Sequence, residues 1–217
     1  MNNYKKIELA TWPRASHWEY YRTIVKANVA MTKKIDVTPV VEFCKQENRH
    51  FSPVMLHVIC KTVNSLDCMK MFADQQGNPC LWEEIHPNFT VFHKDDETFS
   101  DIWMEYYPDL EMFEENYQKI LAQYGDKKGI KVRENQPPNF FPVSCVPWIS
   151  FDSVTTQTVG STMAPLFPII DYGKYELDHG KYRMPVSISI SHAAMDGFHL
   201  AKFFEILQRN ADAMKPE

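Results

Sequence analysis

Near the C-terminal end of the chain, a histidine and an aspartate lie four residues apart, His192 and Asp196, and Gly197 follows directly. An imidazole with the ordinary histidine pKa of about 6.5 is largely neutral at pH 7 and can accept a proton. The six residues that end just before His192 alternate strictly between apolar and polar types, which predicts a half-buried strand. We therefore expect the histidine at a strand end, held by a turn and presented to a cleft as a general base.

The same residues also have a purely structural interpretation. His192 can be an ordinary histidine at the end of a strand, and Asp196 can be the N-cap of a following helix, with Gly197 easing the turn. Taken alone, the spacing of the two residues favours this structural interpretation. The rest of the sequence has to decide between the two.

The elements that would position this turn can be predicted from start signals and periodicity. Two helices are predicted from Thr38-Pro39 and Ser52-Pro53, with Thr38 as an N-cap and the proline at the first helical position. Apolar residues at helical spacing predict three more helices, over residues 17–27, 109–124 and 198–214. Strands are predicted over residues 88–93, 146–154 and 186–191. Together these elements predict an α/β (α+β) fold, a two-layer sandwich in which helices cover a largely antiparallel mixed sheet.

The bulk properties indicate one ordinary globular domain over residues 1–217. Of the 217 residues, 44% are hydrophobic and 24% are charged, and the net charge of −5 does not suggest a nucleic-acid-binding face. The five cysteines are odd in number and show no CxxC spacing, so neither a disulfide framework nor a zinc site is expected. No run approaches the roughly 20 apolar residues of a membrane helix. We expect a cytoplasmic protein without a metal, a nucleic-acid partner or a membrane partner.

Five ordered groups of residues resemble one known family. The segments are 12–14 with 19–22, 51–55, 89–93 with 97–100, 147–153 and 192–199. They are similar to motifs of the chloramphenicol acetyltransferases, which are coenzyme A-dependent acyltransferases with an HxxxDG motif, represented here by His192 to Gly197. The resemblance covers nearly the whole chain and favours the catalytic interpretation of His192.

The resemblance implies a role for each matching residue. His192 would be the general base that takes a proton from the acceptor hydroxyl, and Ser144 would donate a hydrogen bond to the tetrahedral oxyanion. Asp196 and Arg14 would pair and hold the turn. Tyr21, Phe99, Val25 and Val29 match residues that line the acceptor pocket, and Trp148, Lys174 and Tyr175 match residues near the coenzyme. Each also has an ordinary alternative as a core, strand or surface residue. The family further implies a homotrimer with active sites between subunits.

The sequence departs from the family pattern near the acceptor. Ser191 stands where many members have a histidine, and Val29 and Lys131 stand where the family has phenylalanines. A threonine that positions a water near the oxyanion cannot be placed in the segment 164–175. These departures leave the identity of the acceptor undetermined and do not affect the expected acetyl-transfer chemistry.

The expected function is transfer of acetyl from acetyl-CoA to chloramphenicol or a related small alcohol. One alternative is a dihydrolipoamide acyltransferase core, which usually carries a lipoyl domain and a linker that this sequence lacks. Another is a non-catalytic protein on the same trimeric scaffold that binds coenzyme A or a hydrophobic ligand.

Overall fold

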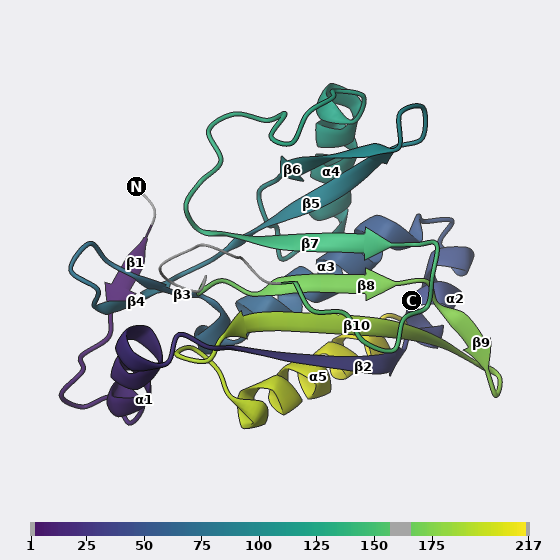
Figure 1. Ribbon diagram of the computed structural model, residues 1–217. Helices are drawn as coiled ribbons and strands as arrows, with labels where there is room; N and C mark the ends of the chain where they lie inside the picture. Colours follow the sequence, from purple (N-terminus) through teal and green to yellow (C-terminus); the bar gives the residue numbers. More distant parts are fainter. Residues whose placement is uncertain (1–2, 157–165, 216–217) are drawn as a thin grey trace.

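The computed structural model describes residues 3–156 and 166–215, and its centre is a seven-stranded mixed sheet (Figure 1). The order across the sheet is β2 (Asn28–Asp36), β10 (Lys181–Ser191), β8 (Ile169–Gly173), β7 (Phe140–Val146), β5 (His86–His93) and β6 (Thr98–Trp103), and the short β9 (Glu176–Asp178) pairs with β10. The pairs β5–β7 and β7–β8 are parallel, and the other pairs are antiparallel. A small second sheet has the order β1 (Tyr4–Lys6), β4 (Pro79–Trp82) and β3 (Met71–Ala73).

Helices cover one face of the large sheet. They are α2 (Thr38–Gln46), α3 (Phe51–Asn64), α4 (Leu110–Tyr124) and α5 (Gly197–Asp212). Helix α3 is buried along most of its length and packs between α4 and α5, while α5 also runs against β2. The alternation in β10 follows this arrangement, because Val186, Ile188 and Ile190 are completely or almost completely buried in the core. The predicted fold class is confirmed.

The opposite face of the sheet carries a row of polar side chains across four strands. In register are Ser144 on β7, Asp171 on β8, Ser187 on β10 and Thr32 on β2. The segment after β7 lies over part of this row, since the Ser187 hydroxyl donates to the carbonyl oxygen of Val154 at 2.6 Å. This polar face, not the helical one, is therefore where chemistry on the sheet is possible.

The predicted strand over residues 146–154 is wrong. Strand β7 begins at Phe140 and ends at Val146, and residues 147–156 form a turn and irregular structure. Pro147 explains the stop, because proline has no backbone N–H to donate to a neighbouring strand. The segment is held instead by single contacts, such as the Lys34–Asp152 ion pair at 3.2 Å.

Several helix boundaries also differ from the predictions; α5, for example, ends at Asp212 and not at residue 214. Helix α2 begins at Thr38 itself, whose N–H donates to Asp36 Oδ1, so Thr38 is not the cap. Helix α3 begins at Phe51, two residues before Pro53, the predicted first helical position. The helix expected over residues 17–27 is a short α1 (Ala15–Glu19) that continues as the π-helical turn η1 (Tyr20–Ile24). In contrast, the helix predicted over residues 109–124 is found as α4, and Asp109 caps it, with its side chain accepting from Met112 N.

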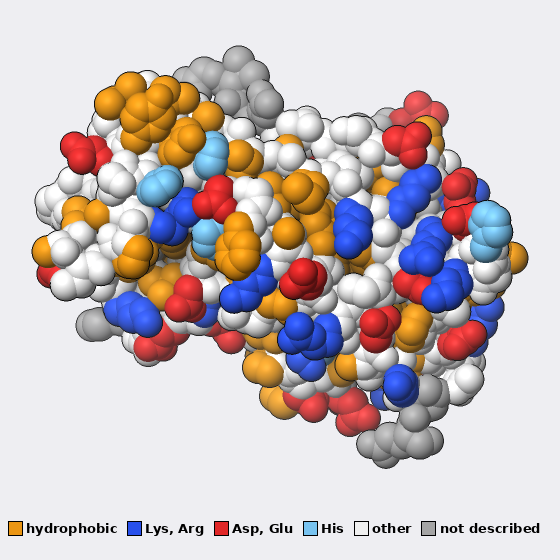
Figure 2. Space-filling view, turned by 90° about the horizontal axis from the view of Figure 1, so that it is seen from below, with side chains coloured by type: hydrophobic (Ala, Val, Ile, Leu, Met, Phe, Trp, Pro, Cys, Tyr) orange, Lys and Arg blue, Asp and Glu red, His pale blue; other side chains and the backbone are white. Residues whose placement is uncertain are grey.

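Two surface properties bear on possible partners. In the face seen in Figure 2, basic and acidic side chains alternate over the surface and no large patch of one sign forms. Within the described ranges, no helix is long and apolar enough to cross a membrane.

Candidate active site

His192 is the first residue after β10 and is held on three sides. Its backbone N–H donates to the carbonyl oxygen of Ala27 at 2.9 Å, and its ring Nδ1 lies 2.9 Å from the carbonyl oxygen of Met195. A carbonyl oxygen can only accept, so Nδ1 carries the hydrogen and Nε2 of the neutral ring keeps its lone pair. The turn thus fixes the tautomer that a general base needs.

An aromatic ring fixes the plane of this imidazole. The Tyr21 ring stacks on the His192 ring with centroids 3.9 Å apart and an interplanar angle of 17°. Tyr21 belongs to the π-helical turn η1, in which Val25 N–H donates to the Tyr20 carbonyl oxygen five residues earlier. Such wide turns are rare and often lie at functional sites. Here the turn brings an aromatic face over the candidate base.

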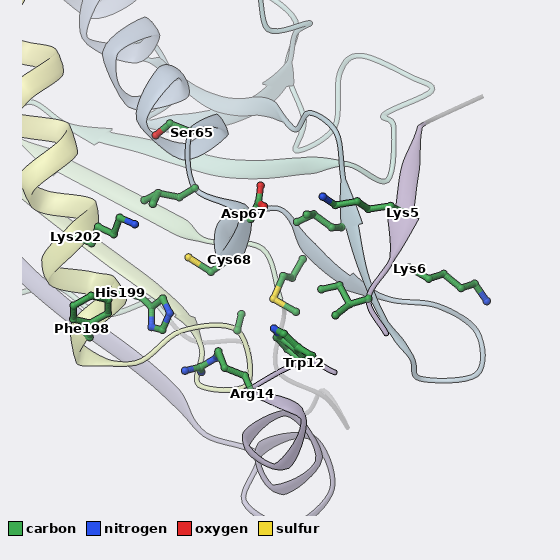
Figure 3. A pocket seen from close by; sticks show the side chains of 15 residues that line it. Lys5, Lys6, Trp12, Arg14, Ser65, Asp67, Cys68, Phe198, His199 and Lys202 are labelled. Atoms are coloured by element: carbon green, nitrogen blue, oxygen red, sulfur yellow. The ribbon is translucent and has the colours of Figure 1, made fainter. Parts of the chain in front are cut away.

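Behind the turn, Asp196 is hydrogen-bonded to both Arg14 and His199. Figure 3 shows the Arg14 and His199 side chains at the wall of a neighbouring pocket. Arg14 Nη1 donates to Asp196 Oδ2 at 2.5 Å, and Arg14 Nη2 donates to the His192 carbonyl oxygen at 3.5 Å. Asp196 Oδ1 lies 2.8 Å from His199 Nδ1 and also accepts from the N–H groups of Phe198 and His199. Asp196 therefore caps α5 and binds Arg14 at the same time. Both sequence-based expectations for Asp196, a helix N-cap and a partner of Arg14, agree with the structure.

The environment of Asp196 favours its charged form. Partial burial alone would raise the pKa of the Asp196 carboxyl, but the hydrogen bonds from His199 and Arg14 lower that pKa well below its ordinary value. The ionised carboxylate of Asp196 keeps Arg14 in place against the carbonyl oxygen of His192. A cavity of about 720 Å³ adjoins this network and is lined by Arg14 and His199, but neither His192 nor Ser144 lines it.

Ser144 lies in a different pocket, of about 430 Å³, near the carboxyl end of β7. Its wall includes Phe99, Phe92 and Trp148, and the Trp148 ring packs edge-on against Phe92 with centroids 4.7 Å apart. In the part of the chain that the structure describes, the Ser144 hydroxyl has no hydrogen-bond partner. A free hydroxyl at a pocket wall can donate to a ligand oxygen.

The residues expected near a coenzyme lie beside the same pocket. Trp148 is 60% exposed, and the next residue, Ile149, accepts a hydrogen bond from Lys174 N–H at 2.9 Å. Tyr175 follows and packs between Phe51 and Tyr182. The structure therefore brings Trp148, Lys174 and Tyr175 into one region, although 26 positions separate the first two in the sequence.

Comparison with known proteins gives this geometry a family. A family model described as chloramphenicol acetyltransferase matches residues 1–208. A chloramphenicol acetyltransferase of Vibrio anguillarum is 35% identical over 205 residues, covering 94% of this chain and 93% of the relative. The chain belongs to the chloramphenicol acetyltransferase family.

Solved structures agree with this family at the level of the fold. A chloramphenicol acetyltransferase structure has a TM-score of 0.84 at 18% identity, covering 96% of this chain and 100% of that one. A structure of Azotobacter vinelandii dihydrolipoamide acetyltransferase has a TM-score of 0.63 at 15% identity, covering 87% and 82% of the two chains. That second structure concerns the roles of a serine, a histidine and an asparagine in the catalytic mechanism of its enzyme.

In this member of the chloramphenicol acetyltransferase family, the predicted site residues fall into two groups. Tyr21 lies on His192, Val29 is the β2 partner of Ile190 close to the end of β10, and Val25 lies just past η1 and is exposed. Phe99 is not with them, because it lies on β6 in the pocket of Ser144. The expected acceptor residues are thus divided between two regions of the chain.

The register of the sheet shows how far apart the two regions are. Ser144 is in line with Ser187, two strands away, and His192 follows Ser187 by five residues. At the usual spacings, this places the two residues about 17 Å apart along the strands and about 10 Å apart across them. Figure 1 shows the same separation, with the carboxyl ends of β7 and β10 at opposite sides of the sheet. Ser144 and His192 of one chain cannot act on the same small molecule.

Two residues of these regions were missed by sequence reasoning about the site. One is His199, which sequence reasoning did not connect with Asp196; its position three residues after a helix N-cap is the signal that could have indicated this contact. Asp171 is a buried carboxyl in register with Ser144, and nothing in its local sequence indicates that neighbour.

Proposed function

We propose that this protein is an acetyl-CoA-dependent O-acetyltransferase that acetylates chloramphenicol or a related small alcohol. The observation that carries the proposal is His192, whose Nδ1 is held by the carbonyl oxygen of Met195 and whose Nε2 is free to accept a proton. The relatives named chloramphenicol acetyltransferase support acetyl-CoA and chloramphenicol as the substrates of the reaction.

In this mechanism His192 moves one proton and forms no covalent intermediate. Nε2 of His192 takes the proton of the acceptor hydroxyl while its oxygen attacks the thioester carbonyl carbon of acetyl-CoA. The Ser144 hydroxyl donates a hydrogen bond to the resulting oxyanion, a contact worth about 3–4 kcal/mol of barrier in comparable sites. When the tetrahedral intermediate collapses, the C–S bond breaks and the protonated His192 returns its proton to the leaving thiolate, giving the ester and free coenzyme A.

We further propose that each active site lies between subunits of a homotrimer. The separation of Ser144 and His192 within one chain supports this, because the two groups can meet at one substrate only if different copies supply them. Closed cyclic symmetry would then complete every site with the same pair of surfaces. In that arrangement Tyr21 and His192 come from one subunit, and Ser144, Phe99 and Trp148 from its neighbour.

The decisive experiment measures release of free coenzyme A thiol from acetyl-CoA with a panel of alcohols and thiols that includes chloramphenicol. Turnover with an alcohol supports the proposal and identifies the acceptor. Turnover with dihydrolipoamide alone would point to the acyltransferase cores of the 2-oxoacid dehydrogenase complexes. No turnover with any acceptor, together with retained acetyl-CoA binding, would indicate a binding protein instead.

Antibiotic resistance and a cytoplasmic location belong to the same proposal. Acetyl-CoA is a cytoplasmic metabolite, and the five cysteines are all free, as in reducing compartments. If chloramphenicol is the acceptor, expression of the chain in a sensitive bacterium raises the inhibitory concentration of the drug, and a His192→Ala variant does not. Equal sensitivity of cells with and without the chain would reject chloramphenicol as its cellular acceptor.

A further inference from the structure

The cavity of about 720 Å³ behind the turn of His192 takes part in no step of the proposed acetyl transfer. It lies where strand β1, the segment that follows α3 and the first turns of α5 meet, and we call it the rear cavity (Figure 3). The pocket of Ser144, at about 430 Å³, is smaller. Cavities of roughly 300–1,000 Å³ are the usual size of binding sites for small organic molecules.

One part of the wall of the rear cavity is apolar. Leu66, Met71 and Leu81 line it and are almost fully buried in the core. The Trp12 ring lies at the same cavity, packs against the core and meets the Trp18 ring at a centroid distance of 6.0 Å. These side chains offer apolar surface against which the body of a ligand can be buried.

Two lysine side chains enter the rear cavity from opposite sides. Lys202 comes from α5 and Lys5 from β1, and in Figure 3 the ends of both side chains point into the cavity. Within residues 3–156 and 166–215, neither ammonium group has a hydrogen-bond or ion-pair partner. The neighbouring Lys6 differs, because its side chain points away in Figure 3 and its Nζ binds Asp74 Oδ2 at 3.0 Å.

The other groups of the wall do not neutralise these two ammonium groups. Asp67 is the one acidic side chain among the described wall residues, and its Oδ1 already pairs with Lys70 Nζ at 3.3 Å. Burial raises the pKa of the Cys68 thiol to about 11, so this wall residue stays uncharged at pH 7. The rear cavity therefore combines an apolar wall with an excess of positive charge.

We propose that the rear cavity is a second binding site, for a small organic carboxylate whose apolar body packs against Trp12 and whose carboxylate is bound by Lys5 and Lys202. A carboxylate accepts from ammonium groups, and its charge balances the two lysines. A neutral amide of the same shape keeps the apolar contact and loses the charge, which corresponds to about a tenfold weaker Kd. The inference goes beyond the acetyl transfer, since neither lysine takes part in that chemistry.

The rear cavity also adjoins the residues that hold the catalytic turn. Arg14 and His199 are part of its wall, and each binds Asp196. Ala194, inside the turn that follows His192, lines the cavity as well. A ligand in the rear cavity therefore lies against the support of the turn and leaves the Nε2 side of His192 open to the acceptor.

The test measures binding of 2-naphthoate and 2-naphthamide to the full-length protein by titration calorimetry. The wild-type Kd for 2-naphthoate should be at least about tenfold lower than that for 2-naphthamide. In Lys5→Met/Lys202→Met the two Kd values should become nearly equal, because methionine keeps the apolar stem and removes the charge. Lys6→Met is the matched control on the same strand, and it should keep the wild-type difference.

Two further measurements on the wild-type protein hold even if the double variant fails to fold. The Kd for 2-naphthoate should rise with salt concentration, because salt screens the two ammonium groups, while that for 2-naphthamide should not. Saturating coenzyme A should leave the Kd for 2-naphthoate unchanged, since Ser144 and Trp148 lie at the other pocket.

The inference fails if the wild-type protein binds both compounds equally, if Lys5→Met/Lys202→Met keeps the difference, or if coenzyme A displaces 2-naphthoate. It also fails if 2-naphthoate does not bind and the lysine variants change the mass seen by light scattering, a result that would assign the cavity to a contact with a second copy of the chain. None of these results bears on thiol release from acetyl-CoA, which tests the proposed function separately.

Discussion

The ring of Tyr21 lies nearly parallel to the imidazole of His192, with centroids 3.9 Å apart. The stack and the hydrogen bond to the Met195 carbonyl oxygen together hold both the plane and the tautomer of the ring. A base held in this way loses little freedom when the acceptor binds, which favours proton transfer in one fixed geometry. The turn after β10 thus orients the catalytic candidate before any substrate is present.

His192→Ala is expected to lower turnover by at least about a hundredfold, because it removes the only group proposed to take the acceptor proton. Acetyl-CoA binding should be largely kept, since the imidazole acts on the acceptor hydroxyl. Thiol release measures the rate, and equilibrium binding of coenzyme A measures the second part. His17→Ala, at an exposed position of α1, is the control. A near-wild-type rate in His192→Ala would remove His192 from the mechanism.

The ion pair of Arg14 and Asp196 should support activity through the shape of the turn. Asp196→Ala and Arg14→Ala are each expected to lower both the melting temperature and the rate, because either change releases the turn that carries His192. In the double variant the losses should be clearly less than additive, as expected for two residues in direct contact. Thermal unfolding and thiol release of the four proteins form the cycle, and additive losses would show that the two side chains act independently.

The lowered pKa of Asp196 also predicts how the thermal stability of the protein depends on pH. Its pKa is lowered in the folded protein, so its ionised form contributes stability above the ordinary pKa of 3.8, and this contribution is lost as the pH falls below that value. Below about pH 4, the melting temperature of the wild-type protein should therefore fall more steeply than that of Asp196→Asn. The difference between the two melting temperatures should shrink as the pH falls. The carboxyl groups of Asp74 and Asp96, whose pKa values are each lowered to about 2, titrate in both proteins and cancel from the comparison. A constant gap across this range would contradict the prediction.

Local signals in the sequence predicted the existence of helices and strands better than the residues at which they begin and end. The apolar spacing over residues 109–124 predicts α4 almost to the residue, because a helical stripe is a local pattern. The strand expected over residues 146–154 failed for a local reason as well, since Pro147 cannot continue the ladder. The apolar residues after it resemble a strand only when the proline is ignored.

The site depended on information that no local pattern contains. Arg14 and Asp196 are 182 residues apart, and only the resemblance to a family suggested that they pair. The stack of Tyr21 on His192 depends on a π-helical turn, which has no sequence signal of its own. The separation of Ser144 from His192 follows from strand order and register, so it became visible only in the assembled sheet.

Replacing Gly173 with alanine is expected to impair coenzyme binding. A Cβ at this position would lie 2.8 Å from the Ile149 carbonyl oxygen and 2.9 Å from the Phe151 ring, closer than real contacts allow. Gly173→Ala should therefore push residues 149–151 away and weaken the bond from Lys174 N–H to Ile149, which moves Trp148 as well. We expect KM for acetyl-CoA to rise several-fold while KM for the acceptor changes less. Gly77→Asn, at an exposed turn with open space and a positive φ that asparagine tolerates, is the control; equal kinetics in both variants would contradict the expectation.

The last prediction concerns sites shared between subunits. Ser144→Ala and His192→Ala should each be nearly inactive alone, since one removes the oxyanion donor and the other the base. When the two variants are co-expressed and assemble at random, about a quarter of the interfaces in a closed ring join an intact Ser144 to an intact His192. Thiol release from the purified mixture should then recover to about a quarter of the wild-type rate. A Ser144→Ala/His192→Ala double variant co-expressed with either single variant is the control, because no interface in it can contain both intact groups.

A mixture of the single variants that stays as inactive as its components, while light scattering gives three times the 25.4 kDa chain mass, would show that each subunit of the trimer carries a whole site. An active species with the mass of one chain would reject the shared site altogether.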